Sequence, residues 1–418
     1  MPDKKLSLTA QILIAMLLGA IIGTAINFAP DSAFITTYVT DGLLDIGGLI
    51  FIDVMKMCVV PVVFVSLVTG VTSLANPKAL GRVGAKAILL YILTTAIAIS
   101  LGLAIASFLN IGHGMNLAAE QAAVTEAAPS FKEVVLDFFP SNPIAAMSEG
   151  NMIQIIVFAL LLGTSISFAK EPGRRLRDFF ADANEVVMEL VMLIIKAAPY
   201  GVFCLIGRLF AKMGFGVIDD LLGYFMTVLV VLVIHVILTN SILLKIFTGL
   251  NPLRFFRKMG SAMMFAFSTS SSNVSIPVTL ETVERKLGVK NSVASFIVPL
   301  GATINMDGTA IMQGVATVFI AHAYNLHIGI GGYLMVVLTA TVASIGTAGV
   351  PSVGLITLIM VLRQVGLPAE GIGLIIGVDR ILDMVRTAVN ITGDAAISTI
   401  IGKSENALDV ETFNKKLQ

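Results

Sequence analysis

Long apolar runs separated by short polar segments make up most of this chain. Most runs equal or exceed the roughly 20 residues that an α-helix needs to cross a bilayer. They cover about residues 6–29, 44–75, 79–108, 151–169, 182–212, 217–247, 259–281, 291–323, 329–362 and 371–401. The pattern predicts an all-α polytopic membrane protein. The first run reads as a spanning helix, because a cleaved signal peptide has a shorter apolar core of about 7–15 residues.

Region 109–150 interrupts this pattern with glycine, proline and acidic residues. It contains one short amphipathic piece, FKEVVLDFF, and the helix breakers Pro140, Pro143 and Gly150. We interpret it as a loop with broken helical pieces that leads into the run at 151.

Lysine and arginine gather in every second loop along the first half of the chain. Lys4 and Lys5 precede the first run, and further basic groups lie at 78–86, 170–177 and 245–258, while the intervening loops carry more acidic residues. Since basic loops stay on the cytoplasmic side, the pattern predicts a cytoplasmic N-terminus and six crossings by residue 247.

Two later runs break this alternation. The run 259–281 has basic residues on both flanks and the polar centre STSSSNVSIP, and the run 329–362 is interrupted by ASIGTAGVPS. Non-helical backbone at membrane depth is tolerated inside protein or beside a water-filled cavity, so both runs read as re-entrant hairpins. Their alternatives are ordinary paired spans or a kinked helix. Two such interrupted segments, each followed by a helix with Asn and Asp near Gly, are typical of inverted repeats in secondary transporters. The C-terminus is then cytoplasmic.

The composition agrees with a membrane protein and argues against several other classes. Of 418 residues, 56% are hydrophobic and 13% charged, and Lys+Arg 27 balance Asp+Glu 27; soluble domains are about 45–50% apolar and about 25% charged. A soluble enzyme, a nucleic-acid-binding protein and a disordered chain are therefore disfavoured. Cys58 and Cys204 lie inside apolar runs, which favours buried hydrophobic side chains over a disulfide or metal site.

Asp307 is the first candidate functional residue. It is the one residue charged at neutral pH between Lys290 and Arg363, and it falls inside the apolar sequence GATINMDGTA. An ionisable group at membrane depth is a functional hypothesis by default. The alternative is a buried acid whose neighbours satisfy it.

The last run carries a polar stripe. At about 100° per residue, Asp379, Asp383, Arg386, Asn390 and Asp394 fall within about 80° of one helix face, and the opposite face is Ile, Leu, Val and Ala. In a bilayer this stripe has to face protein or a water-filled cavity. A weaker cluster is Tyr91, Thr94 and Thr95, because threonine often bonds back to its own helix.

The charges of these residues suggest their ligands. Asp307 and the three stripe aspartates against Arg386 leave a net charge of about −3, and each unpaired buried ion would cost several kcal/mol. Carboxylate and amide oxygens suit a hard cation. A guanidinium is suited to a carboxylate, and Asp383, one turn from Arg386, is placed for an ammonium group. The combination points to an acidic amino acid with bound cations.

Four motifs in this order resemble those of the dicarboxylate/amino acid:cation symporters. They are SSSNVSIPVT, GATINMDGTA, ASIGTAGVPS and DMVRTAVNITGD. The chain is most similar to archaeal and bacterial sodium-coupled aspartate/glutamate transporters, relatives of the excitatory amino acid transporters. The resemblance implies eight transmembrane helices, two re-entrant hairpins and an elevator mechanism. It also implies a homotrimer in the plasma or inner membrane, without enzymatic activity or nucleic-acid binding.

The resemblance also implies a division into domains. Residues 1–75 and 109–212 would form a scaffold, 76–108 and 213–403 a transport domain, and 404–418 a cytoplasmic tail. Within the transport domain, the hairpins would cover about 253–286 and 329–368, and the helices after them about 290–324 and 371–403.

Matching the motifs residue by residue implies one substrate site and three sites for co-transported sodium. Arg386 would bind the side-chain carboxylate of the substrate and Asp383 its amino group. Further substrate contacts would come from Thr387, Asn390, Thr309, Ser270, Ser271, Ser272, Val350 and Gly354. The sodium sites would use Gly301, Asn305, Asn390 and Asp394; Thr303 with Ser344, Ile345 and Thr347; and Tyr91, Thr94, Thr95, Asn305 and Asp307.

Some positions depart from the family's patterns. Gln313 stands where animal relatives carry a glutamate linked to proton countertransport, Met384 where they carry a second arginine, and Asn273 where Gly or Ala is expected. Arg380 is a candidate replacement for that second arginine.

Several alternative functions stay open. A proton-coupled symporter is the main alternative, and a C4-dicarboxylate carrier, a neutral amino acid carrier and an anion channel follow. An intramembrane protease with a nucleophile among Ser270–Ser272 is disfavoured, because no Lys or His in the sequence is placed beside them as a base.

Overall fold

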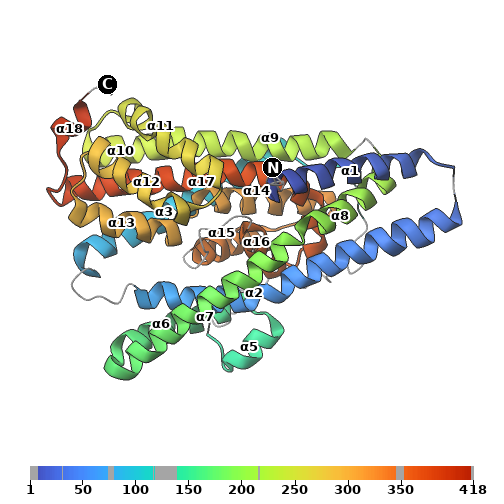
Figure 1. The fold of residues 1–418 in the computed structure, drawn as a ribbon, viewed down its shortest axis with the longest axis horizontal. Helices are drawn as coiled ribbons and strands as arrows, with labels where there is room; N and C mark the ends of the chain where they lie inside the picture. Colours follow the sequence, from blue (N-terminus) through green and yellow to red (C-terminus); the bar gives the residue numbers. More distant parts are fainter. Residues whose placement is uncertain are drawn as a thin grey trace, which may run out of the picture.

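The computed structural model describes residues 8–30, 32–73, 80–115, 117, 139–214, 217–344 and 353–415. Nearly all of them lie in helices (Figure 1). Among these residues, β pairing is limited to one isolated bridge between Val289 and Leu408. The expectation of an all-α protein with several long apolar helices is confirmed.

One group of helices comes from residues 8–73 and 143–213. It consists of α1 (Leu8–Phe28), η1 (Ile35–Leu44), α2 (Asp45–Ser73), α5 (Pro143–Glu149), α6 (Met152–Phe168), α7 (Lys170–Lys196) and α8 (Ala198–Met213). Helix α1 packs along α8, and α2 packs against α6, α7 and α8. The α1–α8 contact is close because it is lined by glycines: a Cβ on Gly23 would lie 2.3 Å from the carbonyl oxygen of Gly207. Small residues allow membrane helices such close approach.

The second group surrounds the long helix α17 (Ile372–Ser404). Helices α8, α9, α10, α11, α13 and α14 all contact α17, and α14 also packs closely on α3. Besides α17, this group consists of η2 (Leu80–Gly84), α3 (Ala85–Leu109), α9 (Val217–Ile234), η4 (His235–Asn240), α10 (Ser241–Thr248), α11 (Pro252–Thr269), α12 (Ser272–Glu281), η5 (Thr282–Lys286), α13 (Asn291–Ile304), α14 (Asp307–Ala323), α15 (Ile330–Ser344), α16 (Val353–Gln364), η6 (Ala369–Gly371) and α18 (Val410–Asn414).

Four helical stretches in the described residues are long and apolar enough to cross a membrane: Ala10–Phe28, Ile35–Thr69, Arg82–Leu109 and Asp219–Thr248. A fifth results if α7 and α8, bent by 47° at their junction, count as one span. The bend lies beside Pro199, in the first turn of α8, where a proline ring and missing N–H prevent the preceding helix from continuing. Helix α17 has the length, but it carries five charged residues between 379 and 394. The number of eight spans stays a prediction.

Helices α7 and α14 differ from the sequence interpretation. Helix α7 begins at Lys170, well before the expected run at 182, because the charged stretch before that run is also helical. The run 291–323, expected as one helix, is interrupted at Asn305 and Met306, whose backbones leave the helical region. The interruption lies directly beside the candidate residue Asp307.

The first predicted hairpin is present as two helices packed on each other, α11 and α12. Ser270 takes a left-handed conformation with φ 50°, and the Ser271 hydroxyl caps α12 by accepting from the Val274 N–H at 3.3 Å. Helices α15 and α16 also pack together, but the tip of the second hairpin, 345–352, lies outside the described residues. The side from which each hairpin enters a membrane stays a prediction. Most of the amphipathic piece FKEVVLDFF also lies outside.

The C-terminal segment (residues 405–414) folds back onto α11 and η5. The buried Lys258 donates to the carbonyls of Lys286 at 2.7 Å and Thr412 at 2.8 Å. Phe413 is fully buried under the Lys258 ammonium group, with 5.8 Å between the nitrogen and the ring centre. In Figure 1 α18 lies beside α11, far from α5 and α6.

Candidate functional site

The polar stripe of α17 is buried as the sequence predicts. Asp379, Asp383, Arg386, Asn390 and Asp394 are each at most 7% exposed. Since the helices around α17 cover this face, the stripe contacts protein.

Arg386 is held by two aspartates of its own helix. Its two terminal nitrogens donate to Asp379 Oδ1 at 2.6 Å and to Asp383 Oδ1 at 2.9 Å, and Arg380 approaches Asp383 Oδ2 at 3.4 Å. These four residues form the arginine–aspartate cluster, whose formal charge is zero. The net charge of about −3 expected from the sequence counted four aspartates against Arg386 alone. The structure places a second arginine, Arg380, beside Asp383, so the net charge of these residues is less negative than expected. The Arg386 Nε is buried without a hydrogen-bond partner among the described atoms.

Two neighbouring helices place further predicted substrate residues beside Arg386. A Cβ on Gly354 of α16 would lie 3.0 Å from the Thr309 methyl and 3.7 Å from a terminal nitrogen of Arg386. Thr309 belongs to α14 and is 8% exposed. The Thr387 hydroxyl donates to the Asp383 carbonyl at 2.8 Å. The structure thus gathers Arg386, Thr309 and Gly354, whereas Val350 lies outside the described residues.

The tip of the first hairpin is buried as well. Ser270, Ser271 and Ser272 are each at most 4% exposed, and the Ser270 hydroxyl has no hydrogen-bond partner among the described atoms. Both α11 and α12 pack on α17. A buried hydroxyl without a partner is unfavourable, and a polar ligand would satisfy it.

A second cluster, the oxygen cluster, forms where the α13–α14 interruption meets α3 and α17. Its members are Tyr91, Thr94, Thr95, Gly301, Asn305, Asp307, Asn390 and Asp394. The Asp307 Oδ1 accepts from Thr95 at 2.7 Å and from Thr94 at 3.3 Å. Asn305 donates to Asp394 Oδ1 at 2.8 Å, and the Gly308 N–H donates to the Asn390 side-chain oxygen at 2.8 Å.

Gly301 brings backbone against this cluster. A Cβ there would lie 2.3 Å from Asp394 Oδ1 and 2.6 Å from the Tyr91 hydroxyl, closer than side-chain atoms can approach. The Tyr91 hydroxyl donates to the Ile297 carbonyl at 3.0 Å. The predicted first and third sodium sets therefore lie together around the interruption.

The oxygen cluster has unused acceptors and uncompensated charge. Asp394 Oδ2 and Asn305 Oδ1 are buried without a hydrogen-bond partner among the described atoms. In the described part of the chain, no lysine or arginine pairs with Asp307 or Asp394. If both acids are ionised, the cluster carries a charge of −2, which hard cations coordinated by oxygen would balance.

The second predicted sodium set is not assembled by its described residues. The Thr303 side chain is exposed, and its hydroxyl donates back to the carbonyls of Pro299 and Leu300 at 3.0 and 3.1 Å. The Ser344 hydroxyl donates to the Thr341 carbonyl. Ile345 and Thr347 lie outside the described residues, so this set stays a prediction.

One polar contact was missed at the sequence level. His235 of η4 is fully buried, and its Nε2 lies 3.1 Å from Asp307 Oδ2. The available signal was a histidine inside an apolar run, VLVIHVIL. The rule that makes an intramembrane ionisable residue a functional candidate applies to His235 as well as to Asp307.

Residues 8–404 match the sodium:dicarboxylate symporter family. The chain belongs to this family. The Escherichia coli "proton/glutamate-aspartate symporter" is 34% identical to it over 421 residues, which cover 98% of this chain and 95% of the relative. The Bacillus subtilis "proton/sodium-glutamate symport protein" is 36% identical over 410 residues (96% and 93%). "Excitatory amino acid transporter 1" of Ambystoma tigrinum is 32% identical over 447 residues (93% and 81%).

Membership in a family of symporters agrees with the apolar helices and with an integral membrane protein. It confirms the resemblance read from the four motifs. The names of the relatives include both proton and sodium as coupling ion, so they do not decide between the two.

Proposed function

We propose that this chain is a secondary symporter that imports acidic amino acids, L-aspartate or L-glutamate or both, together with sodium ions. The observation that carries the proposal is the division of charge along α17. The arginine–aspartate cluster pairs two arginines with two aspartates, whereas the oxygen cluster, which begins one turn further on at Asn390, has buried oxygens without a partner among the described atoms and a charge of −2 when Asp307 and Asp394 are ionised.

The arginine–aspartate cluster suits a zwitterion that carries an extra carboxylate. Arg386 would exchange Asp379 or Asp383 for the side-chain carboxylate of the substrate, and Asp383, once released, would accept its ammonium group. A C4-dicarboxylate would leave Asp383 facing a ligand without an amine. A neutral amino acid would offer Arg386 no carboxylate at its side chain. Both would therefore bind less favourably.

The oxygen cluster favours sodium over a proton as the coupling ion. A proton can neutralise Asp394 or Asp307, but it leaves the buried Asn305 oxygen without a partner. A sodium ion accepts several oxygen ligands at once. It would draw on Asp394, Asn305 and the Gly301 backbone in one position, and on Asp307, Thr94 and Thr95 in the other.

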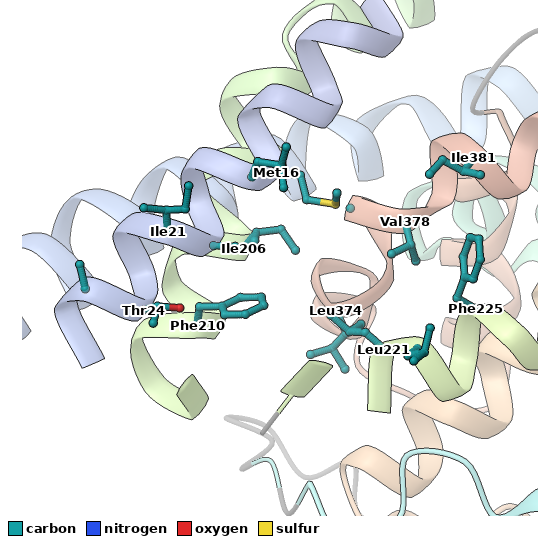
Figure 2. A pocket seen from close by; sticks show the side chains of 15 residues that line it. Met16, Ile21, Thr24, Ile206, Phe210, Leu221, Phe225, Leu374, Val378 and Ile381 are labelled. Atoms are coloured by element: carbon teal, nitrogen blue, oxygen red, sulfur yellow. The ribbon is translucent and has the colours of Figure 1, made fainter. Parts of the chain in front are cut away.

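We further propose that the two helix groups move past each other as a scaffold (α1, α2, α5–α8) and a transport domain (α3, α9–α17), within a homotrimer. Between the groups lies an apolar pocket of about 670 Å³ (Figure 2). Its walls come from α1 and α8 on one side and from α9 and α17 on the other, and Met16, Phe210, Phe225 and Val378 are among the side chains that face it. No charged side chain is among the described residues that line this pocket, and such an apolar wall offers little resistance to sliding.

Uptake of radiolabelled aspartate and glutamate into proteoliposomes tests the function, with sodium and proton gradients imposed separately. We expect uptake driven by a sodium gradient at equal pH on both sides. Uptake driven by a proton gradient in sodium-free buffer would overturn the sodium assignment, and the absence of acidic amino acid uptake under both gradients would overturn the substrate.

A variant extends this experiment to the site. Asp394→Asn should raise the sodium concentration for half-maximal uptake about tenfold or more, as loss of a ligand charge does. Asp219→Asn, at an exposed position at the start of α9, is the matched control and should behave as wild type.

A further inference from the structure

His235 is a buried polar residue within the apolar stretch VLVIHVIL. It is fully buried and begins η4, a short π-helical stretch between α9 and α10. Single π-helical turns inside α-helices are frequent at functional sites. Here η4 packs against both α3 and α17, the helices that supply most of the oxygen cluster.

The contact with Asp307 has a definite direction. A carboxylate accepts hydrogen bonds, so the His235 Nε2, 3.1 Å from Asp307 Oδ2, is the nitrogen that carries the hydrogen. His235 Nδ1 has no hydrogen-bond partner among the described atoms. Nothing described on that side of the ring holds it, so Asp307 is the polar group that orients the imidazole.

The two oxygens of Asp307 therefore face different helices. Oδ1 accepts from the hydroxyls of Thr94 and Thr95 on α3, while Oδ2 accepts from His235 on η4. All three donors lie on other helices than Asp307 itself, so both oxygens of its carboxylate are held from outside α14. Rotation of the carboxylate would break the contacts on both sides.

We infer that His235 is a positioning residue for the cation site at Asp307. By holding Oδ2, it keeps Oδ1 beside the two threonine hydroxyls, where a sodium ion would find three oxygens already arranged. Outer partners of metal ligands typically contribute a factor of about 10–100 in metal affinity. The inference rests on the proposed sodium coupling, and it adds a residue from a helix that supplies no other member of the oxygen cluster.

The test uses the full-length chain in proteoliposomes and sodium chloride as the probe. His235→Met removes the donor at similar volume, and His235→Gln keeps an N–H donor. His322→Gln is the matched control, because His322 is a partly buried histidine whose Nδ1 contacts the Ile111 carbonyl at 2.9 Å, outside both clusters. For each protein we would measure the half-saturating sodium concentration for aspartate uptake, the aspartate KM at saturating sodium, and the Tm.

We expect His235→Met to raise the half-saturating sodium concentration about tenfold or more and to leave the aspartate KM at saturating sodium within about twofold. His235→Gln should recover most of the sodium affinity, and His322→Gln should match wild type. If His235→Met does not fold, His235→Asn replaces it, because its shorter amide does not reach Asp307, and the same loss is expected.

Three results would overturn the inference. An unchanged sodium requirement in His235→Met with a lowered Tm would make His235 a packing residue. Equal losses in His235→Met and His235→Gln would show that the N–H donor is not what matters. In either case wild-type sodium dependence would still support the proposed function. Sodium-independent uptake by the wild type would overturn the proposed function itself, and the inference with it.

Discussion

Arg386 is a buried charged residue whose charge is paired within its own helix. It is fully buried, yet its two partners, Asp379 and Asp383, lie seven and three residues before it on the same helix. Because charge-assisted hydrogen bonds of a guanidinium are strong and directional, one helix face supplies a complete ion-pair network. A ligand that binds here has to compete with this internal pairing.

Arg386→Lys tests whether the planar guanidinium is needed for substrate. A lysine keeps the charge but loses the two-pronged geometry, so we expect aspartate affinity to fall at least about 100-fold, as when a buried charged partner is lost. Isothermal titration calorimetry at saturating sodium measures it, with Tm as the folding control. Wild-type aspartate affinity in this variant would remove Arg386 from the substrate site.

At this scale, the sequence predicted which residues share a face but not how they pair. A helical wheel places Asp379, Asp383 and Arg386 on one stripe, and all are buried there. It does not state that Arg380 approaches Asp383, or that His235 reaches Asp307 from another helix. Such contacts depend on how helices pack against each other.

At the scale of elements, the interruption between α13 and α14 organises the oxygen cluster. It exposes backbone and turns the Asn305 side chain toward α17, where it donates to the Asn390 carbonyl at 3.2 Å and to Asp394. Gly301, one turn earlier, lets the Asp394 carboxylate and the Tyr91 hydroxyl come against the α13 backbone.

Gly301→Ala should therefore disturb the proposed cation site. The added methyl group would lie 2.3 Å from Asp394 Oδ1, so we expect a loss of about 1–3 kcal/mol in stability from overpacking and a higher half-saturating sodium concentration. Gly223→Ala is the control, because a Cβ at this helical position meets no atom within 4 Å, and alanine there should raise stability slightly. Thermal unfolding and sodium titration measure both; equal behaviour of the two variants would contradict the close packing at Gly301.

The tip of the first hairpin and the interruption between α13 and α14 differ in how well the sequence predicts them. The first hairpin was predictable because polar residues and proline interrupt an apolar run, and α11 and α12 separate at Ser270. The break at Asn305 and Met306 was not predicted, because the length of the surrounding apolar run indicates one helix although Asn, Asp and Gly in NMDG are poor helix formers. The contact of the Asn305 side chain with α17 depends on tertiary packing, which the sequence pattern does not give.

For the whole molecule, polar contacts at one end connect segments that are far apart in sequence. Glu405, just after α17, accepts hydrogen bonds from Arg82 of η2 and from Lys86 of α3. The hydrogen bond from Arg82, followed by that from Lys86, lowers the pKa of Glu405 from its ordinary value of 4.5 to about 2. These contacts fasten the start of α3 to the end of α17.

Because the folded-state pKa of Glu405 is depressed, the stability that it contributes is present above about pH 4.5 and is lost as the pH falls towards 2. We expect Glu405→Gln to lower Tm at pH 7, and we expect the difference from wild type to shrink as the pH falls from about 4.5 towards 2. The effect should be small, because Arg82 is largely exposed and surface pairs contribute little. A Tm difference that stayed constant across a pH series measured by differential scanning fluorimetry would contradict the pairing.

The docked C-terminal segment has a practical consequence for watching the molecule work. Residues 405–414 are held against α11 and η5 through Lys258. A spectroscopic probe at the exposed Lys415 would therefore move with the proposed transport domain. A second probe at the exposed Ser148 on α5 would stay with the proposed scaffold. The distance between these two dyes would then report the movement of one helix group relative to the other during transport. Both dye positions lie outside the arginine–aspartate cluster and the oxygen cluster.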